Sequence, residues 1–159
     1  MSLRIGHGLD AHRLVDGRPL MLGGIRVEHE RGLAGHSDGD AVVHALCDAL
    51  LGAAGLGDMG AHFPSSDDRW RDAPGAEFLG AVATMLRARG LRVVSAQVVA
   101  VAQEPRLAAS LPAMRAACAA ALRINAAVLA ISATSSDGMG FVGRGEGIAA
   151  SAVVLLEDI

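Results

Sequence analysis

The sequence contains no lysine, so all 14 of its basic residues are arginine. Without a lysine amine, Schiff-base catalysis, a pyridoxal phosphate anchor and a lysine-type P-loop are excluded. The formal net charge of −3 gives the chain no general electrostatic reason to bind nucleic acid or an anionic membrane. We therefore expect neither nucleic acid nor a membrane as a partner.

Cysteine and long apolar runs are also scarce. Cys47 and Cys118 lie in apolar helical surroundings, which indicates buried, reduced thiols and a cytoplasmic location rather than a disulfide framework. Arg123 ends the alanine-rich run 116–122, so no stretch is long and apolar enough to span a bilayer. Asp10 and His12 interrupt any apolar run near the start, which argues against a secretory or transit peptide.

The pattern of apolar residues predicts one domain over residues 1–159, because 52% hydrophobic content fills a single core and the chain is too short for two ordinary domains. We expect an α/β (α+β) fold, a sandwich of helices on a mixed four-stranded sheet plus a small hairpin. The predicted strands are 3–12, 91–102, 128–134 and 148–156, the helices are 35–51, 77–89 and 110–122, and the hairpin lies within 18–27.

The first predicted helix is apolar nearly all round except for one polar stripe. That stripe consists of Asp40, His44 and Asp48, which are spaced four apart and so lie over one another on a helix. Ser37 or Asp38 can cap the helix, with Asp40 in its first turn. A lone histidine on such a helix is more often a hydrogen-bonded structural residue than a ligand, so this interpretation stays open until a second cluster is found.

A second cluster lies on the first predicted strand. Asp10 and His12 are two residues apart and share one strand face, so they can hold an ion from below while His44 reaches it from above. One carboxylate and two imidazoles leave a position open, as in catalytic zinc sites, although iron, cobalt or manganese are not excluded. Asp48 or Asp40 is a candidate to hold the far ring nitrogen of a liganding histidine.

Two loops are candidates to contact a ligand. The segment 56–75 carries Asp58, His62 and Phe63, and it is either a mobile loop over a site or a plain solvated linker. The segment 135–147 contains five glycines, which would let its backbone lie close to a ligand.

Long, ordered motifs carry a family resemblance over nearly the whole chain. They are RIGHGLDAH at 4–12, HSDGDAVVHALCDALLGAAGLGDMG at 36–60, FP at 63–64, AQEPRL at 102–107 and GFVGRGEGIA at 140–149. With these motifs the chain resembles the 2-C-methyl-D-erythritol 2,4-cyclodiphosphate synthases, the cyclising enzymes of non-mevalonate isoprenoid biosynthesis. The resemblance implies a homotrimer with active sites at the subunit interfaces.

The resemblance also implies a reaction and two metal sites. Asp10, His12 and His44 match zinc ligands, and Asp137 matches the residue that binds a second ion, Mg²⁺ or Mn²⁺, between the substrate phosphates. The substrate would be 4-diphosphocytidyl-2-C-methyl-D-erythritol 2-phosphate. Its 2-phosphate would attack the zinc-bound β-phosphate and expel CMP, so that no water nucleophile is needed.

Further residues receive roles from the same resemblance. His36 and Ser135 match positions that stabilise the transition state. The matched substrate-binding positions, which include the hydroxyl contacts, the lid, the cytidine pocket and the trimer channel, are Asp10, His12, His36, Ser37, Asp58, Gly60, Phe63, Pro64, Asp67, Ala102, Pro105, Arg106, Leu107, Ala108, Thr134, Ser135, Asp137, Phe141 and Arg144. Phe141, Arg144 and Glu146 match residues around the trimer channel, and packing of the trimer is an equally good explanation for all three.

The chain departs from the family pattern at three positions. Arg106 and Gly138 stand where lysine is expected, and Asp137 stands where glutamate is usual. Two other functions remain open. One is a zinc phosphohydrolase in which water enters the open metal position, and the other is a non-catalytic trimeric binder of isoprenoid phosphates. Intact ligand positions and His36 argue against the non-catalytic binder.

Overall fold

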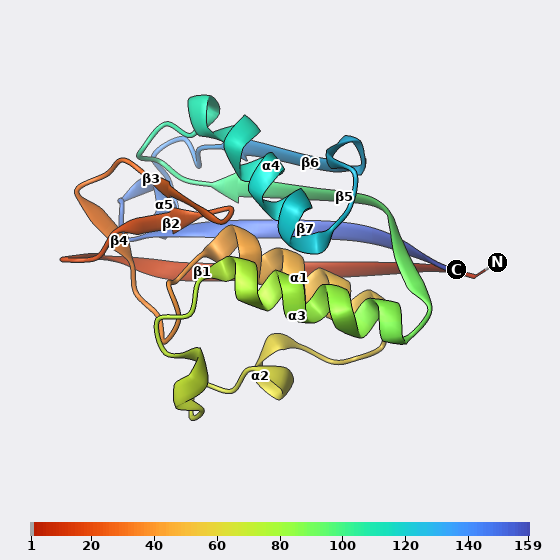
Figure 1. Cartoon of the computed structure of the whole chain (residues 1–159). Helices are drawn as coiled ribbons and strands as arrows, with labels where there is room; N and C mark the ends of the chain where they lie inside the picture. Colours follow the sequence, from red (N-terminus) through yellow and green to blue (C-terminus); the bar gives the residue numbers. More distant parts are fainter. Residues whose placement is uncertain (1) are drawn as a thin grey trace.

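Five strands form a mixed sheet in the computed structural model, which describes residues 2–159 (Figure 1). Across the sheet the order is β4, β1, β7, β5, β6, and only the β5–β6 pair is parallel. A separate hairpin pairs β2 with β3. The strands are β1 (Leu3–Asp16), β2 (Leu20–Leu22), β3 (Ile25–Val27), β4 (Arg31–Leu33), β5 (Leu91–Val101), β6 (Leu129–Thr134) and β7 (Gly147–Asp158).

Helices α1, α3 and α4 lie on one face of this sheet (Figure 1). Helix α1 packs directly on β1 and β7, whereas α3 packs against α1 and α4. The helices are α1 (Ala41–Ala53), α2 (Met59–His62), α3 (Gly75–Ala88), α4 (Leu111–Leu122) and α5 (Gly140–Gly143), with three short 3-10 turns at Asp68–Trp70, Ala108–Ser110 and Ala126–Val128. None of the helices within residues 2–159 is long and apolar enough to cross a membrane.

The predicted α/β architecture and the hairpin are confirmed, but the predicted four-stranded sheet is wrong. The fifth strand is β4, which pairs antiparallel with the end of β1 through Leu14↔Leu33 and Asp16↔Arg31. Its three residues are too short to show an alternating pattern in the sequence. The strand matters for the site because the chain leaves it directly into the loop before α1.

Helix α1 begins later than predicted, at Ala41, and its N-cap is Asp40 rather than Ser37 or Asp38. The buried Asp40 carboxylate accepts hydrogen bonds from the amides of Val43, Gly23 and Gly24 at 3.0, 2.9 and 2.7 Å. Burial raises the pKa of Asp40, while these amides favour the charged form. One side chain thus caps α1 and ties it to the turn of the β2–β3 hairpin.

The backbone of α1 lies directly on β1 because two strand positions have no side chain. A Cβ atom on Gly6 would overlap the carbonyl oxygen of Ala49, and one on Gly8 would overlap that of Ala45. Glycine is therefore required at both strand positions by the close approach of two backbones. This contact sets the distance between the helix and the strand that carry the predicted metal ligands.

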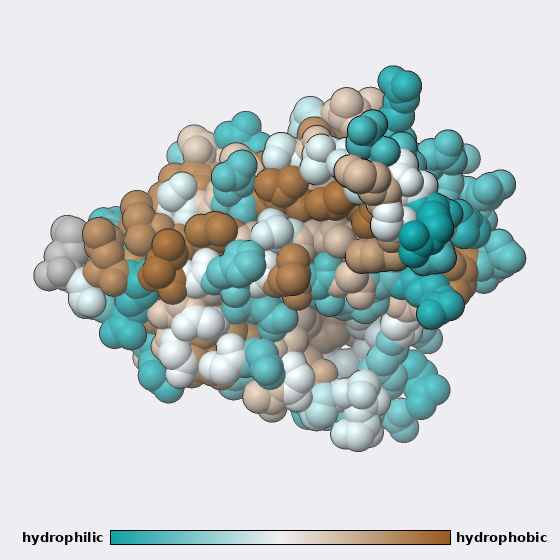
Figure 2. All heavy atoms as spheres, turned by 180° about the vertical axis from the view of Figure 1, so that it is seen from behind, coloured by the Kyte–Doolittle hydropathy of each residue, from teal (hydrophilic) through white to brown (hydrophobic). Residues whose placement is uncertain are grey.

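The opposite face of the sheet is apolar and open. Leu3, Ile5, Leu9 and Val153 are 61%, 74%, 69% and 44% exposed, and no element within residues 2–159 covers them. Apolar side chains gather over the strands in the view from behind (Figure 2). Open apolar surfaces of this kind are typical of interfaces with another chain.

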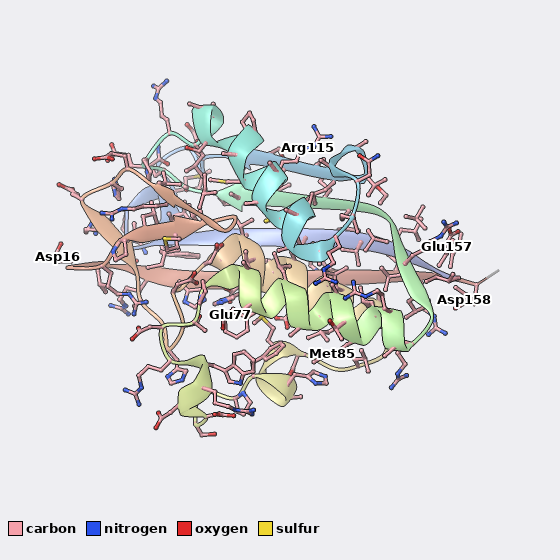
Figure 3. The ribbon with its side chains drawn as sticks, viewed as in Figure 1. Asp16, Glu77, Met85, Arg115, Glu157 and Asp158 are labelled. Carbon is pink, nitrogen blue, oxygen red and sulfur yellow. The ribbon has the colours of Figure 1, made fainter. Side chains whose placement is uncertain are left out.

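The sheet has two distinct ends. Asp16 ends β1 at one edge of the molecule, whereas Glu157 and Asp158 of β7 lie at the other edge, near the start of β1 (Figure 3).

Cys47 and Cys118 are free and buried in the core, as predicted. Burial raises the pKa of the Cys118 thiol to about 12 and also raises the pKa of the Cys47 thiol well above its usual range, so both thiols are poor nucleophiles in the folded chain.

The close contact of α1 with β1 predicts a large difference between two glycine-to-alanine substitutions. Gly8→Ala places a methyl group against the α1 backbone, and we expect a loss of about 2–3 kcal/mol in the free energy of unfolding. The control Gly80→Ala adds a methyl group to a half-buried position of α3 where no atom lies within 4 Å of the new Cβ, and we expect a gain of about 0.5–1 kcal/mol. Urea unfolding at one protein concentration measures both, and equal effects would contradict the packing described here.

Candidate active site

Strand β1 and helix α1 bring three metal-ligating side chains to one point. Asp10 and His12 point to the same side of β1, and His44 lies near the start of α1. Nε2 of His12 is 2.8 Å and Nδ1 of His44 is 3.4 Å from Oδ2 of Asp10, and the two ring nitrogens are 3.1 Å apart. All three ligand atoms lie within 4.8 Å of one another, so the structure brings together the three predicted ligands.

The donor atoms of this group fit a divalent cation. Oδ2 of Asp10 is buried, and its short contacts with both rings lack hydrogen-bond geometry, as expected for ligands aimed at a common point. Burial raises the pKa of Asp10, but His12 and His44 outweigh this and hold the pKa below its usual range. Burial lowers the pKa of His12, but the Asp10 carboxylate outweighs this and raises the pKa. A cation between the three side chains would satisfy the buried carboxylate oxygen.

The outward ring nitrogens of both histidines are held by other groups. Nδ1 of His12 donates to the carbonyl oxygen of Ala34 at 2.6 Å. Nε2 of His44 lies 3.1 Å from the hydroxyl oxygen of Ser37, which is buried. These partners leave Nε2 of His12 and Nδ1 of His44 to face the Asp10 carboxylate, which is the orientation a metal ligand needs.

The prediction that Asp40 or Asp48 holds one of these ring nitrogens is therefore wrong. The Asp40 carboxylate is occupied by backbone amides at the start of α1. Asp48 instead accepts a hydrogen bond from the amide of Met59 at 2.8 Å and so ties α2 to α1. Burial raises the pKa of Asp48, and the Met59 amide partly opposes the rise. Helical spacing predicts that these side chains share one stripe of the helix, but it does not show which backbone amides will donate hydrogen bonds to them.

The segment 56–75 is packed over the metal-binding group, so its interpretation as a plain linker is wrong. The ring of Phe63 meets Trp70 edge-on at 4.8 Å and Phe78 edge-on at 5.1 Å between centroids. Phe78 in turn meets the imidazole of His44 edge-on at 5.8 Å. These rings form an aromatic wall between the segment and a predicted metal ligand. Such a wall limits the access of water from that side.

A cavity of about 240 Å³ opens beside the three ligands. It brings together the predicted residues Asp10, His12, His36, Ser37, His44, Gly60 and Phe63. The imidazole of His36 reaches the carbonyl oxygen of Asp67 at 3.1 Å, which fixes one of its nitrogens. The cavity is also lined by Asp48, which was predicted next to the ligands in another role, and by residues that the sequence did not place in the site, namely Met59, Ser65, Trp70 and Phe78.

A second cavity of about 390 Å³ lies where β6 ends and the turn after β5 begins. It brings together the predicted cytidine-pocket positions and two other predicted substrate-binding residues, with three residues in addition. The cytidine-pocket positions are Ala102, Pro105, Arg106, Leu107 and Ala108, the two others are Thr134 and Ser135, and the additional residues are Gln103, Leu111 and Ala133. None of the residues that line this cavity lines the first one. Within one chain, the metal-binding group and the predicted nucleotide pocket are therefore separate.

Several predicted residues line neither cavity. The side chains of Asp58 and Asp67 cap short helical turns, at 3.0 Å from the amides of Ala61 and Arg69 respectively. Pro64 follows directly after Phe63 in the packed segment. The lining of both cavities therefore omits Pro64 and Asp67 of the predicted lid and the predicted hydroxyl contact Asp58.

The glycine-rich loop after β6 also lies outside the first cavity. Asp137 adopts a left-handed φ of 54°, and its amide lies 3.2 Å from the Ser135 hydroxyl. Arg144 pairs with Glu146 at 3.1 Å, and Phe141 lines a third cavity together with His12 and Glu146. Asp137 does not belong to the metal-binding group of the described chain.

The aromatic wall was not predicted from the sequence, although the rarity of aromatic residues in the chain could have indicated it. The chain has one tryptophan and three phenylalanines, and Phe63, Trp70 and Phe78 meet beside His44. In a chain with 3% aromatic residues, such rings deserve consideration as site residues. Their sequence positions alone, however, do not show that a loop residue and a helix residue will meet.

A comparison with protein families matches residues 3–157 to the YgbB family. The 2-C-methyl-D-erythritol 2,4-cyclodiphosphate synthase of Moorella thermoacetica is 51% identical over 156 residues, which cover 98% of this chain and 96% of that protein. A solved CDP-bound form of 2C-methyl-D-erythritol-2,4-cyclodiphosphate synthase has a TM-score of 0.88 and 38% identity, and the match covers 97% of this chain and 100% of that one.

A longer protein shares the same fold. The bifunctional IspDF of Campylobacter jejuni matches 99% of this chain with a TM-score of 0.95 and 35% identity. The match covers 43% of that longer chain, so the similarity concerns one part of it.

The three-ligand group predicts that His44→Ala abolishes stable metal binding while the chain stays folded. Two remaining ligands hold zinc far more weakly than three, and the substitution removes one ring from the start of an otherwise buried helix. The zinc content of the purified protein, measured by mass spectrometry of the metal, checks this. His29→Gln, at a histidine between β3 and β4 and outside the group, is the matched control and should keep its zinc. Normal zinc content in His44→Ala would refute the ligand assignment.

Proposed function

The chain belongs to the YgbB family, and on this premise we propose that it is a zinc-dependent cyclodiphosphate synthase of isoprenoid biosynthesis, a lyase by reaction class. It would convert 4-diphosphocytidyl-2-C-methyl-D-erythritol 2-phosphate into 2-C-methyl-D-erythritol 2,4-cyclodiphosphate and CMP. The observation that carries the proposal is the convergence of Asp10, His12 and His44 beside a cavity that His36 and Ser37 also line. The names of the relatives and of the CDP-bound structure support the choice of substrate.

The reaction needs the substrate folded back on itself more than it needs a reactive side chain. An oxygen of the 2-phosphate attacks the β-phosphorus, and the bond from that phosphorus to the oxygen bridging it to the α-phosphate breaks. The electron pair leaves with CMP, so no water or proton source is consumed. Because nucleophile and electrophile are in one molecule, holding both phosphates close supplies much of the rate enhancement.

Each residue of the cavity has a role in that arrangement. Asp10, His12 and His44 would hold a zinc ion, which would neutralise phosphate charge as it develops in the transition state. The His36 imidazole and the Ser37 hydroxyl would bind phosphate oxygens, because both line the cavity next to the ligands. The aromatic wall formed by Phe63, Trp70 and Phe78 would exclude water, and so suppress hydrolysis.

The second cavity would hold the cytidine moiety. Its volume of about 390 Å³ and its backbone-rich turn suit a base that is read by backbone groups. Arg106 would meet a phosphate with its planar guanidinium in place of an ammonium group, and Ser135 would stabilise the transition state from this side. Asp137 would hold Mg²⁺ or Mn²⁺ between the phosphates, directly or through a water, since its side chain is about 1.5 Å shorter than glutamate.

A homotrimer would join the two cavities into one active site. The open sheet face with Leu3, Ile5, Leu9 and Val153 is the surface we propose to be buried between copies of the chain. The separation of the two cavities within one chain supports this arrangement, because a substrate that carries both a nucleotide and a second phosphate must reach both. Each site would take its metal-binding group from one subunit and its nucleotide turn from the next.

The first test of the proposed reaction is to identify its products by phosphorus NMR. With substrate, zinc and Mg²⁺ we expect one cyclic diphosphate and CMP, and with water enriched in oxygen-18 we expect no label in either product. Zinc-depleted protein is the control and should be inactive. A ring-opened phosphate that carries oxygen-18 would show that water is the nucleophile, and the chain would then be a phosphohydrolase.

The second test mixes two inactive variants. His44→Ala removes a metal ligand and Arg106→Ala removes a nucleotide contact, so each homotrimer should be inactive. In mixed trimers some interfaces combine an intact metal-binding group with an intact nucleotide turn, and roughly a quarter of wild-type activity should return. Each variant refolded alone is the control. Verified mixed trimers without rescue would contradict a site shared between subunits.

A further inference from the structure

In the loop between β4 and α1, the backbone carbonyl oxygens of residues 34–37 all accept hydrogen bonds. Two of these residues, His36 and Ser37, are the proposed phosphate-binding residues. This loop carries His36 and Ser37 into the first cavity. The carbonyl oxygen of Ala34 accepts from Nδ1 of His12 at 2.6 Å, and that of His36 accepts from the amide of Asp72 at 2.8 Å. Among residues 34–37, the two other carbonyl oxygens are those of Gly35 and Ser37, on either side of His36.

Arg18 donates to both of those carbonyl groups. Its Nη1 lies 2.8 Å from the oxygen of Gly35, and its Nη2 lies 2.6 Å from the oxygen of Ser37. One guanidinium group, from the turn between β1 and β2, therefore holds the backbone immediately before and after His36. Within residues 2–159, no carboxylate forms an ion pair with Arg18, so the backbone contacts account for its orientation.

We call these two hydrogen bonds of Arg18 the clamp. The loop needs the clamp because its own sequence allows many backbone conformations. Gly35 and Gly39 flank the two phosphate-binding positions, and Gly39 adopts a left-handed φ of 77°. Glycines allow many backbone conformations, so the native one must be selected by contacts from outside the loop. The hydroxyl of Ser37 also meets Nε2 of His44, and the clamp therefore supports a proposed metal ligand as well.

We propose that Arg18 is a positioning residue for the cyclisation reaction, which acts by fixing the backbone on both sides of His36. The inference rests on the proposed function for its effect on turnover. Arg18 is not among the residues that line the cavity beside the metal-binding group, so it acts through His36 and Ser37 rather than on the substrate.

Arginine suits this role better than any other side chain. Its planar fork presents several N–H donors in fixed directions, so two carbonyl oxygens can be bound at once without loss of geometry. The nearby carboxylates do not compete for it. The carboxylate of Asp38, which lines the same surface hollow as Arg18, accepts from the amides of Asp40 and Gly75 instead.

The test compares Arg18→Ala with Arg26→Ala, an exposed arginine on β3 that lies outside both cavities. For Arg18→Ala we expect kcat to fall between about tenfold and about a hundredfold, because small misplacements of catalytic groups cost that much. KM should change much less than kcat, since the lost contact matters most in the transition state. Zinc content should stay normal, and Arg26→Ala should match the wild type.

Added guanidinium ion provides the rescue that a merely structural role would not show. At millimolar concentration and constant ionic strength, we expect guanidinium chloride to restore part of the kcat of Arg18→Ala, whereas sodium chloride should not. A normal kcat in Arg18→Ala would overturn the proposal, and so would a fall in kcat that guanidinium leaves unchanged.

Hydrogen exchange separates the failure of this proposal from the failure of the proposed function. In Arg18→Ala, amides of residues 34–40 should exchange faster than in the wild type, and guanidinium should slow them again; neither measurement needs a substrate. If the wild type lacks cyclase activity, the proposed function fails while the exchange result still decides whether Arg18 fixes the loop. Unchanged exchange in these amides would refute the clamp itself.

Discussion

The contact between the backbones of α1 and β1 is the constraint on which the rest of the structure depends. Glycines at positions 6 and 8 let the carbonyl groups of Ala49 and Ala45 lie against the strand. Four residues of helix rise about 6.0 Å and two residues of strand about 6.6 Å, so the two elements stay in register along this contact. Continued by one step, the register brings the start of the helix over Asp10. His44 can then meet Asp10 and His12 without any adjustment of either backbone.

The metal ligands could be predicted from the sequence because their geometry is local to two regular elements. A spacing of two on a strand fixes Asp10 and His12 to one side, and one histidine on the neighbouring helix completes the set. The hairpin was also predictable, since paired glycines between two short apolar runs are a strong turn signal. In both cases the spacing of residues along the sequence directly determines how they are arranged in the structure.

The parts that were not predicted depend on contacts between distant segments. Strand β4 is too short to show a period, and α1 is capped by Asp40 because amides of a distant hairpin share that carboxylate. The partners of the ligand histidines are a carbonyl oxygen at Ala34 and a hydroxyl at Ser37, which only the folded loop brings into reach. The aromatic wall likewise joins a loop to α3. No spacing rule connects such pairs.

We propose an assembly larger than one subunit, and two features of the chain support it. One face of the sheet is covered by helices while the other exposes large apolar side chains, which is costly for an isolated chain in water. The metal-binding group lines one cavity of the chain, and the proposed nucleotide pocket is a second, separate cavity. Burial of the open sheet face between copies of the chain would remove these apolar side chains from water. It would also complete the proposed active site.

The central claim is that Asp10, His12 and His44 bind one metal ion through the atoms that converge in the structure. Anomalous diffraction at the zinc absorption edge, from crystals of the wild-type protein grown with zinc, tests this most directly. We expect one strong peak about 2.0–2.2 Å from Nε2 of His12, Nδ1 of His44 and a carboxylate oxygen of Asp10. A fully ordered site with no anomalous peak between these atoms, in crystals that bind zinc elsewhere, would contradict it.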